Sequence, residues 1–264
     1  MSLKTQTVIV TGGAGGIGKS LVRHLIGQGL HVGIIDVDQA ALDLAEELNS
    51  ESARCQSVLA DISDADAVQD AVQTLRTALG PVQGLVNNAG IVNNIAPLEK
   101  MKQAAWEKEI AVNLTGAFNL IRAVIPQMRE AGYGRIVNVS SGAARGGLIN
   151  QAGYSASKAG LLGLTRAVTL EYARHDITCN AVLPGMTATE KVEAMPDMIK
   201  SAALSMTPAG RFGSTDEASH LIAFLLSAEA GFINGADIDI TGGAHLNVMP
   251  LGSRKEATRQ KDGT

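Results

Sequence analysis

Residues 7–18 read TVIVTGGAGGIG, an apolar strand-like run followed at once by a cluster of glycines. A strand that ends at Thr11 and a helix that begins near Gly16 leave backbone N–H groups pointing out of the turn between them. Glycines in such a turn let a pyrophosphate group approach the backbone and the helix N-terminus closely. The chain contains 29 glycines, so the position of this string between the first strand and the first helix counts for more than its composition.

Six further strand-like runs alternate with longer segments of helical period. The predicted strands cover residues 7–11, 31–36, 56–60, 84–87, 135–140, 177–183 and 237–240, with helical patterns between them, as in 17–28 and 161–174. Repeated strand–helix alternation predicts parallel strands joined by right-handed crossovers. We therefore expect an α/β fold with one doubly wound, Rossmann-type parallel sheet and helices on both faces. No composition break divides it, so one domain is expected over residues 1–250, with a polar C-terminal extension over 251–264.

The composition narrows the class of protein. Aromatic residues make up 3% of the chain, so the core must consist mainly of Ala, Val, Ile and Leu, which suits parallel strands covered on both faces. A net charge of −4 without a basic stripe argues against a nucleic-acid partner.

No apolar run reaches about 18 residues and no signal peptide precedes the first strand, so a cytoplasmic protein without a membrane partner is expected. Cys55 and Cys179 lie in apolar runs and are expected to be buried thiols, and the five histidines show no ligand spacing, so no metal is expected.

Two glycine registers overlap in the first turn. Gly13, Gly15 and Gly18 fit the spacing G-x-G-x-x-G, whereas Gly12, Gly16 and Gly18 fit the looser spacing T-G-x-x-x-G-x-G. Both spacings predict a dinucleotide site, and motifs later in the chain favour the second.

Asp36 is the predicted selector of the cofactor. It ends the second predicted strand, 18 residues after Gly18. A carboxylate there can accept both hydroxyls of an adenosine ribose and would repel a 2′-phosphate, which favours NAD(H) over NADP(H). Gly15 adds no basic side chain to hold such a phosphate. The alternative is an N-cap for the next helix, but the spacing from the glycines favours the ribose role.

The sequence YSASK, from Tyr154 to Lys158, is the predicted catalytic core. The i, i+4 spacing puts the phenol and the ammonium on one face of a helix that follows the serines Ser140 and Ser141. A free tyrosine titrates near pH 10, so proton transfer near neutrality needs a stabilised phenolate. The Lys158 ammonium and an oxidised nicotinamide ring are both expected to lower the pKa of Tyr154.

Taken together, the motifs resemble the short-chain dehydrogenase/reductase family over residues 7–243, and the chain looks like an NAD-preferring member. The resemblance rests on TGGAGGIG at 11–18, NNAG at 87–90, Asn113 in AVNLTG, the serine pair at 140–141, YSASK at 154–158 and PGMTAT at 184–189. The chain departs from the family's pattern at Ala144, where glycine is common, and at Thr187, where isoleucine or valine is usual. These departures affect the shape of the cleft and remove no catalytic group.

The resemblance implies a role for each matching residue. Ser141, 13 residues before Tyr154, would hold the substrate oxygen, Lys158 would also bind the nicotinamide ribose, and Asn113 would hold a water that links Lys158 to solvent. Thr189 and the backbone of Thr187 would hold the carboxamide. The implied catalytic residues are Asn113, Ser141, Tyr154 and Lys158. The implied cofactor-binding residues are Gly12, Gly16, Ile17, Gly18, Asp36, Asp61, Ile62, Asn88, Ala89, Gly90, Tyr154, Lys158, Pro184, Gly185, Thr187 and Thr189.

These roles predict hydride transfer between NAD(H) and a secondary alcohol or ketone. A second possibility is a 3-oxoacyl thioester reductase, which the sequence around Tyr154 also resembles. Carrier-protein reductases usually prefer NADPH and carry basic residues near positions 132 and 175, where this chain has Gly132 and His175. A coenzyme A thioester stays open as a substrate. A non-catalytic dinucleotide sensor is a third possibility, but it predicts loss of Ser141, Tyr154 or Lys158, and all three are present.

Two expectations concern larger features. Residues 190–206 are amphipathic and rich in methionine, so they form either a surface helix on the core or a mobile lid over the cleft, and their position after Thr189 favours the lid. Members of the family commonly form homotetramers. Long apolar stretches in the helical segments 102–130 and 152–174 agree with buried contacts between subunits, although cover within one subunit would also explain them.

Overall fold

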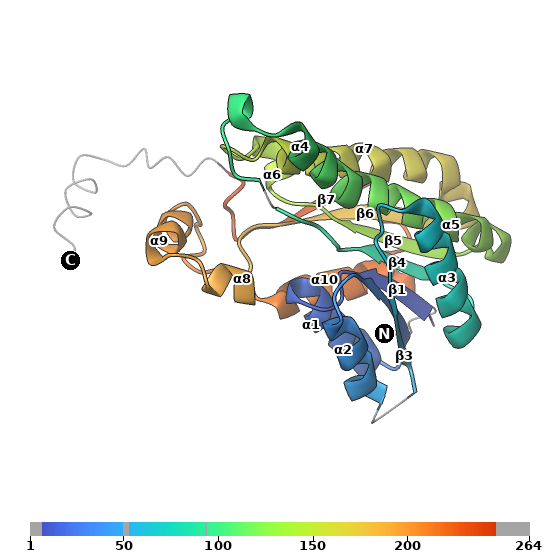
Figure 1. The fold of residues 1–264 in the computed structure, drawn as a ribbon. Coiled ribbons are helices and arrows are strands. Elements are labelled where there is room, and N and C mark those ends of the chain that lie inside the picture. The colour runs from blue at the N-terminus through green and yellow to red at the C-terminus, as the bar shows by residue number, and fades with distance from the viewer. Residues whose placement is uncertain (1–6, 50–52, 93, 247–264) are drawn as a thin grey trace.

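A computed structural model describes residues 7–49, 53–92 and 94–246 (Figure 1). Seven parallel strands form one sheet in the order β3-β2-β1-β4-β5-β6-β7. The strands are β1 (Thr7–Thr11), β2 (His31–Asp36), β3 (Cys55–Leu59), β4 (Gly84–Asn87), β5 (Gly134–Val139), β6 (Ile177–Pro184) and β7 (Asp237–Ile240). The predicted doubly wound α/β fold is confirmed.

Helices cover both faces of this sheet. They are α1 (Gly16–Gly27), α2 (Ala40–Asn49), α3 (Ala65–Leu79), α4 (Gln103–Ile110), α5 (Gly116–Ala131), α6 (Ala143–Gly146), α7 (Ala152–Tyr172), α8 (Glu190–Glu193), α9 (Asp197–Ser205) and α10 (Thr215–Leu226). Short turns of other helix types are η1 (Leu98–Lys100), η2 (Ala111–Thr115), η3 (Ala173–His175) and η4 (Ala228–Ala230). Figure 1 shows α4, α5 and α7 on one side of the sheet and α1, α2 and α10 on the other.

The alternation of side chains along β1 shows why helices are needed on both faces of the sheet. Val8 and Val10 pack into a core with α1, α2 and α10, whereas Ile9 between them packs into a second core with α3, α5 and α7. All three side chains are fully buried. Aliphatic residues dominate both cores, as the low aromatic content predicted.

The order of the strands creates the crevice in which the site lies. From β1 the chain builds outward through β2 to β3 and then returns to place β4 on the other side of β1. At this change of direction the loops after β1 and β4 diverge at the carboxyl ends of the strands, where open parallel sheets bind their ligands. The glycine-rich turn follows β1, and the NNAG motif begins at the end of β4.

Four of the predicted strands match the observed bounds, and the others are offset or lengthened by one residue. The helical segment predicted over 152–174 corresponds to α7 followed by η3. The first half of α7 buries Ser157 and Lys158, and buried polar side chains interrupt the hydrophobic pattern of a helix. The predicted boundary at 250 and the extension over 251–264 lie outside the described residues. In the described part of the chain, no helix has the length and apolar character needed to cross a membrane.

Candidate active site

The glycine-rich turn between β1 and α1 requires glycine at three positions. Gly12 and Gly16 have φ values of +65° and +53°, in the left-handed region that favours glycine. A Cβ atom at Gly18 would lie 2.1 Å from the carbonyl oxygen of Gly12. At Gly15 a Cβ atom would meet nothing within 4 Å. The backbone therefore agrees with the register of Gly12, Gly16 and Gly18.

The loop after β4 is bonded directly to this turn. The Asn88 side chain donates to the carbonyl oxygens of Thr11 at 3.0 Å and Gly12 at 2.9 Å. In return, the Thr11 hydroxyl accepts the backbone N–H groups of Asn88 and Ala89, both at 3.0 Å. The floor of the crevice is thus a fixed pair of loops, and the Asn88 amide serves as a brace within it.

Two carboxylates follow the neighbouring strands β2 and β3. Asp36 is half-buried and accepts the N–H of Ala14 at 2.9 Å, which ties the end of β2 to the glycine-rich turn. Its other oxygen accepts the N–H of Val37 at 2.7 Å. Asp61 is exposed and accepts both the N–H and the hydroxyl of Ser63, at 2.9 and 2.7 Å. Asp36 is therefore anchored against the turn, whereas Asp61 organises only its own loop.

Ser141, Tyr154 and Lys158 meet at the carboxyl end of β5 and the start of α7. The Ser141 hydroxyl accepts the N–H of Ala143 at 3.1 Å and lies close enough to the Tyr154 phenol to lower the pKa of that phenol. Lys158 is buried, and its Nζ atom lies 5.8 Å from the centre of the Tyr154 ring. The same Nζ atom donates to the carbonyl oxygen of Val139 at 2.8 Å. The structure thus brings the three predicted side chains together.

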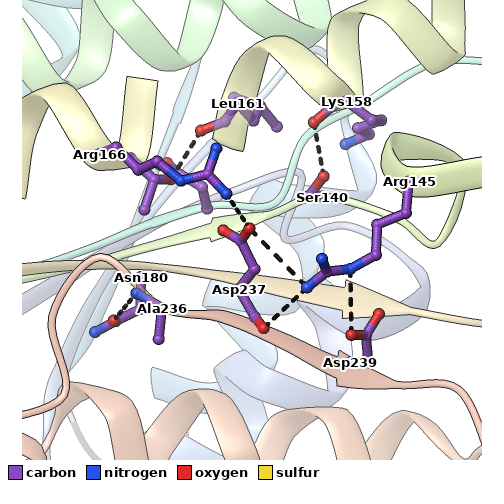
Figure 2. Close-up of polar contacts among 11 residues, drawn as sticks. Ser140, Arg145, Lys158, Leu161, Arg166, Asn180, Ala236, Asp237 and Asp239 are labelled. Carbon is purple, nitrogen blue, oxygen red and sulfur yellow. Dashed lines mark hydrogen bonds and ion pairs between the residues drawn. The ribbon is translucent and has the colours of Figure 1, made fainter. Parts of the chain in front are cut away.

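Ser140 has a different position from Ser141. Figure 2 shows its hydroxyl directed at the backbone of α7, where it donates to the carbonyl oxygen of Lys158 at 2.8 Å. Ser140 is buried, whereas Ser141 is half-buried and faces Tyr154. Of the two serines, Ser141 therefore has the hydroxyl beside the phenol, as the spacing predicted.

Asn113 lies in η2, a single π-helical turn between α4 and α5. Its side chain accepts the N–H of Ile91 at 2.7 Å and donates to the carbonyl oxygen of Ile91 at 2.9 Å. It also donates to the Ser157 hydroxyl at 3.1 Å. A Cβ atom at Gly90 would lie 3.2 Å from Lys158 Nζ and 3.5 Å from Asn113 Oδ1, so Asn113 lies close to the lysine. Its two bonds to Ile91 hold the loop after β4, and the predicted water relay remains a prediction.

Burial dominates the electrostatics of Tyr154 and Lys158 in the chain without cofactor. Burial raises the pKa of the phenol above its ordinary value; the hydrogen bond from Ser141 opposes that rise, and the negative charge of Glu109 adds to it. Burial also lowers the pKa of Lys158 to about 8. The Lys158 ammonium bonds to Val139, and the lowering of the Tyr154 pKa by Lys158 together with a bound oxidised nicotinamide remains a prediction.

The segment after β6 completes the rim of the crevice. Thr189 lies beside the glycine-rich turn, since a Cβ atom at Gly16 would be 3.3 Å from its Cγ2 methyl group. The Thr189 hydroxyl accepts the N–H of Val192 at 3.4 Å and caps α8. Thr187 is buried, and Gly185 fits closely against Thr241, to whose Cα atom an added Cβ would come within 3.0 Å. PGMTAT therefore reaches the glycine-rich turn through Thr189.

The remaining predicted cofactor residues line or support the same crevice. Ile17 packs against the core beneath α1, and Ile62 is buried against Gly116. Pro184 ends β6, and its carbonyl oxygen accepts the N–H of Gly142 at 3.1 Å. Two further residues, Ser157 and Glu109, lie next to the predicted ones. Ser157 belongs to YSASK, but the motif assigned it no role. Glu109 belongs to no motif, and only the packing of α4 on α7 brings it there.

Comparison with known proteins agrees with this architecture. A family model described as short chain dehydrogenase matches residues 6–200. The chain belongs to this family. A 3-oxoacyl-[acyl-carrier-protein] reductase of Thermotoga maritima is 36% identical to this short-chain dehydrogenase over 244 residues, covering 92% of this chain and 99% of the relative. An acetoacetyl-CoA reductase of Rhizobium meliloti is 37% identical over 243 residues, with the same coverage of both chains.

A levodione reductase of Leifsonia aquatica is similar to this short-chain dehydrogenase in sequence. The two are 34% identical over 249 residues, which cover 90% of this chain and 93% of the relative. A crystal structure of levodione reductase superposes on this dehydrogenase with a TM-score of 0.87 at 32% identity and covers 92% of this chain and 99% of the other. The family supports an oxidoreductase that acts on CH–OH or keto groups with a nicotinamide dinucleotide.

Proposed function

We propose that this protein transfers a hydride between NAD(H) and a secondary alcohol or ketone, with Tyr154 as the acid–base group. The observation that carries the proposal is that Ser141, Tyr154 and the buried Lys158 meet at the end of β5 and the start of α7, with Lys158 Nζ 5.8 Å from the centre of the Tyr154 ring. A phenol and a hydroxyl side by side can both contact one substrate oxygen. Ser141 and Tyr154 together can stabilise negative charge that develops on that oxygen.

The crevice fits the dinucleotide that the family uses. An added Cβ atom at Gly12 would lie 2.8 Å from Ala89 Cα, and one at Gly18 would meet backbone at 2.1 Å, so side chains are excluded where a pyrophosphate would approach. The N-terminus of α1 begins at Gly16 and favours negative charge. We propose that this turn binds the pyrophosphate, with Asp61 and residues 88–90 along the adenosine. The nicotinamide end would be held by Lys158 and by Thr187 and Thr189.

The preference for NAD(H) rests on Asp36. Its carboxylate lies at the end of β2 and accepts the N–H of Ala14 at 2.9 Å, which holds it beside the turn where the ribose would lie. A 2′-phosphate there would meet a negative charge at short range, which is unfavourable. Gly15, which faces open space, gives no compensating cation.

The residues of the chain supply the proton and the alignment. When bound, the nicotinamide supplies or accepts the hydride. In reduction, the Tyr154 O–H donates its proton to the substrate oxygen while the Ser141 hydroxyl holds that oxygen in place. In oxidation, Tyr154 accepts the hydroxyl proton of the alcohol. The Lys158 ammonium lies near the ring and favours the phenolate that reduction leaves behind.

A 3-oxoacyl thioester is the second candidate substrate. The observation that favours it is the identity of 36% and 37% to reductases named for 3-oxoacyl carrier-protein and acetoacetyl-CoA substrates. Gly132 and His175, the positions at which basic residues would meet an acidic carrier protein, do not supply a cationic pair in this chain. Among thioesters, we therefore favour coenzyme A forms over carrier-protein forms.

The experiment measures kcat/KM with NADH and NADPH on a panel of ketones and 3-oxoacyl thioesters. The absorbance of the reduced cofactor monitors turnover. We expect NADH to be preferred, and Asp36→Ala to relax the preference because the repulsion of the 2′-phosphate disappears. Asp38→Ala, an exposed neighbour, is the matched control and should leave the preference unchanged. Equal or better use of NADPH by the wild-type protein would refute the assignment of the cofactor, and absence of turnover across the panel would refute the substrate class.

A further inference from the structure

Strand β7 directs two carboxylates toward α6 and α7. Asp237 and Asp239 are two residues apart, so their side chains lie on the same side of the strand. Arg145 Nε lies 3.3 Å from the Asp239 carboxylate, and Arg166 pairs with Asp237 (Figure 2). The Arg145 guanidinium also donates to the carbonyl oxygen of Asp237 at 3.3 Å and lies 4.0 Å from its carboxylate. We call these four residues the β7 ion-pair network.

The two carboxylates of this network lie mostly within the protein. The side chain of Asp237 is 8% exposed and that of Asp239 is 15% exposed. In the part of the chain that the structure describes, the second oxygen of each carboxylate is buried and has no hydrogen-bond partner. Removing the cation beside a carboxylate in such a position leaves a charge that nothing compensates, which is costly. The network is therefore a stronger constraint than an isolated ion pair on the surface.

Arg145 connects this network to Ser141, because it lies on α6, the single helical turn that follows the serine. The Ser141 hydroxyl accepts the N–H of Ala143 at 3.1 Å, and the Ser141 carbonyl oxygen accepts the N–H of Ala144 at 3.0 Å. Both donors belong to α6, so the position of Ser141 follows that of α6. A helix of four residues is not stable by itself. Contacts of Ala144 with a small apolar cluster and the ion pairs of Arg145 hold α6 in place.

The other half of the network holds the helix that carries Tyr154. Arg166 lies on α7, 12 residues after Tyr154, which is about 18 Å along the helix axis. Because α7 is one continuous helix of 21 residues, the pair of Arg166 with Asp237 restrains the whole helix relative to β7. Asp237 lies near both arginines, so α6 and α7 are held against the same residue of the strand.

We propose that Arg145 is a positioning residue for Ser141. Its ion pairs with β7 hold α6 where the Ser141 hydroxyl and the Tyr154 phenol can contact the same substrate oxygen. The guanidinium is directed to two carboxylates of β7, so Arg145 acts through α6 and makes no contact with the substrate (Figure 2). This inference rests on the proposed function, in which Ser141 holds the substrate oxygen.

The test compares the kinetics of Arg145→Met and wild type on the best substrate of the panel. Methionine keeps an unbranched side chain but cannot pair with a carboxylate. We expect kcat to fall by about tenfold, because a misplaced group slows the chemical step, while the affinity for NADH in a fluorescence titration changes by less than about twofold. Arg145→Lys keeps the charge and should lose less activity than Arg145→Met.

Arg23→Met is the matched control. Arg23 pairs with Glu47 at 2.7 Å, and its side chain is 42% exposed, close to the 44% of Arg145. This pair joins α1 to α2, away from Ser141, so its loss should leave kcat unchanged. Unchanged kcat in Arg145→Met, or an equal fall in Arg23→Met, would overturn the proposal.

A double-mutant cycle with Ser141→Ala separates positioning from a general effect on the fold. If Arg145 acts through the Ser141 hydroxyl, Arg145→Met should lower kcat by less than about twofold once that hydroxyl is gone. A merely structural role would lower kcat by the same factor in both backgrounds, and that result would contradict the proposal.

The variant Arg145→Met/Asp239→Asn covers the case in which the unpaired carboxylate prevents folding of Arg145→Met. It removes the ion pair without leaving a charge at position 239. We expect kcat to fall by about the same factor as in Arg145→Met, because α6 has still lost its tie to β7. Wild-type kcat in this double variant would show that the pair does not position Ser141.

Hydrogen exchange gives a readout that requires no turnover. The N–H groups of Ala143 and Ala144, which bond to Ser141, should exchange faster in Arg145→Met than in wild type, while those of α3 stay unchanged. Faster exchange at these two groups in a protein that turns over no substrate of the panel would refute the proposed function and leave the hold of Arg145 on α6 standing. Unchanged exchange at Ala143 and Ala144 would overturn the inference itself.

Discussion

The hydroxyl group of Tyr154 is the atom on which the proposed chemistry depends. Tyr154→Phe removes it and leaves the ring in place. We expect turnover to fall by about a hundredfold or more, the usual scale for a positioned acid–base group, while the affinity for NADH stays nearly unchanged. Steady-state kinetics and a fluorescence titration with NADH measure the two effects. Tyr172→Phe, at the end of the same helix, is the control, and near-normal turnover in Tyr154→Phe would show that another group is the acid.

Lys158 makes the stability of the protein depend on pH. Burial lowers its pKa from 10.5 to about 8, so over this window the unfolded chain binds a proton that the folded chain has lost. The free energy of unfolding should therefore rise with pH through the window, by roughly 3 kcal/mol at about 1.4 kcal/mol per pKa unit. Below the window the cost of burying the ammonium is fully present.

Urea unfolding of wild type and Lys158→Met measures this effect, because other titrating groups cancel in the difference. The advantage of the methionine variant should be largest near neutral pH and should shrink as the pH rises through the window. Lys191→Met, which replaces an exposed lysine on α8, should show no such trend. A difference that is constant with pH would mean that Lys158 keeps its ordinary pKa in the folded chain.

Single residues show which features of the candidate site could be predicted from the sequence. Ser141, Tyr154 and Lys158 could be predicted because a short motif and its spacing fix them on one helix and the loop before it. The direction in which the Tyr154 pKa shifts could not be predicted, because it depends on burial and on Glu109, which is 45 residues away in the chain. A contact made only by tertiary packing leaves no local pattern to read.

The segment over residues 190–206 forms two short helices rather than one. Pro196 separates α8 from α9, as its missing N–H group requires. No residue of α9 is buried, and Met198 is 83% exposed, so the interpretation as a helix packed on the core loses its support. Figure 1 shows α9 standing away from the sheet beyond α8. An exposed apolar helix beside the crevice agrees with a lid but does not test its closure.

We predict that NADH and substrate close this segment over the crevice. Hydrogen exchange should then show greater protection of residues 190–206 on binding NADH than of α2 and β3 at the opposite edge of the sheet. Met198→Ala should change the preference among substrates more than the affinity for NADH, since its side chain is free to meet the substrate. Equal protection with and without NADH would identify α8 and α9 as a fixed structure.

For the molecule as a whole, the sequence predicted the class of fold and the order of elements correctly. Alternating strand and helix patterns are local, and the rule for right-handed crossovers converts them into a topology.

The apolar character of α5 was less informative about assembly. Leu120, Val124 and Met128 are fully buried within one subunit, so those residues give no argument for contacts between subunits.

Assembly into a tetramer remains a prediction, and exposed apolar side chains now support it better than α5 does. Leu170 on α7 is 86% exposed, and Phe232 before β7 is fully exposed. Sedimentation at micromolar concentration should give about four times the subunit mass of 27.4 kDa. Leu170→Ser should weaken the assembly, because it removes apolar area from the surface. A wild-type particle of one subunit mass would refute the oligomer.

Strand β7 brings two aspartates to the edge of the sheet, and both bond to helices that flank the site. Arg145 of α6 pairs with Asp239 at 3.3 Å, and Arg166 of α7 pairs with Asp237 (Figure 2). During synthesis the ribosome releases β7 after the six other described strands, and Ser141 and Tyr154 have emerged long before it. A nascent chain that stops short of residue 237 therefore holds the proposed catalytic side chains but lacks the acidic partners of Arg145 and Arg166. Because domains fold as units as they are made, activity should be acquired late in translation, when the last strand docks.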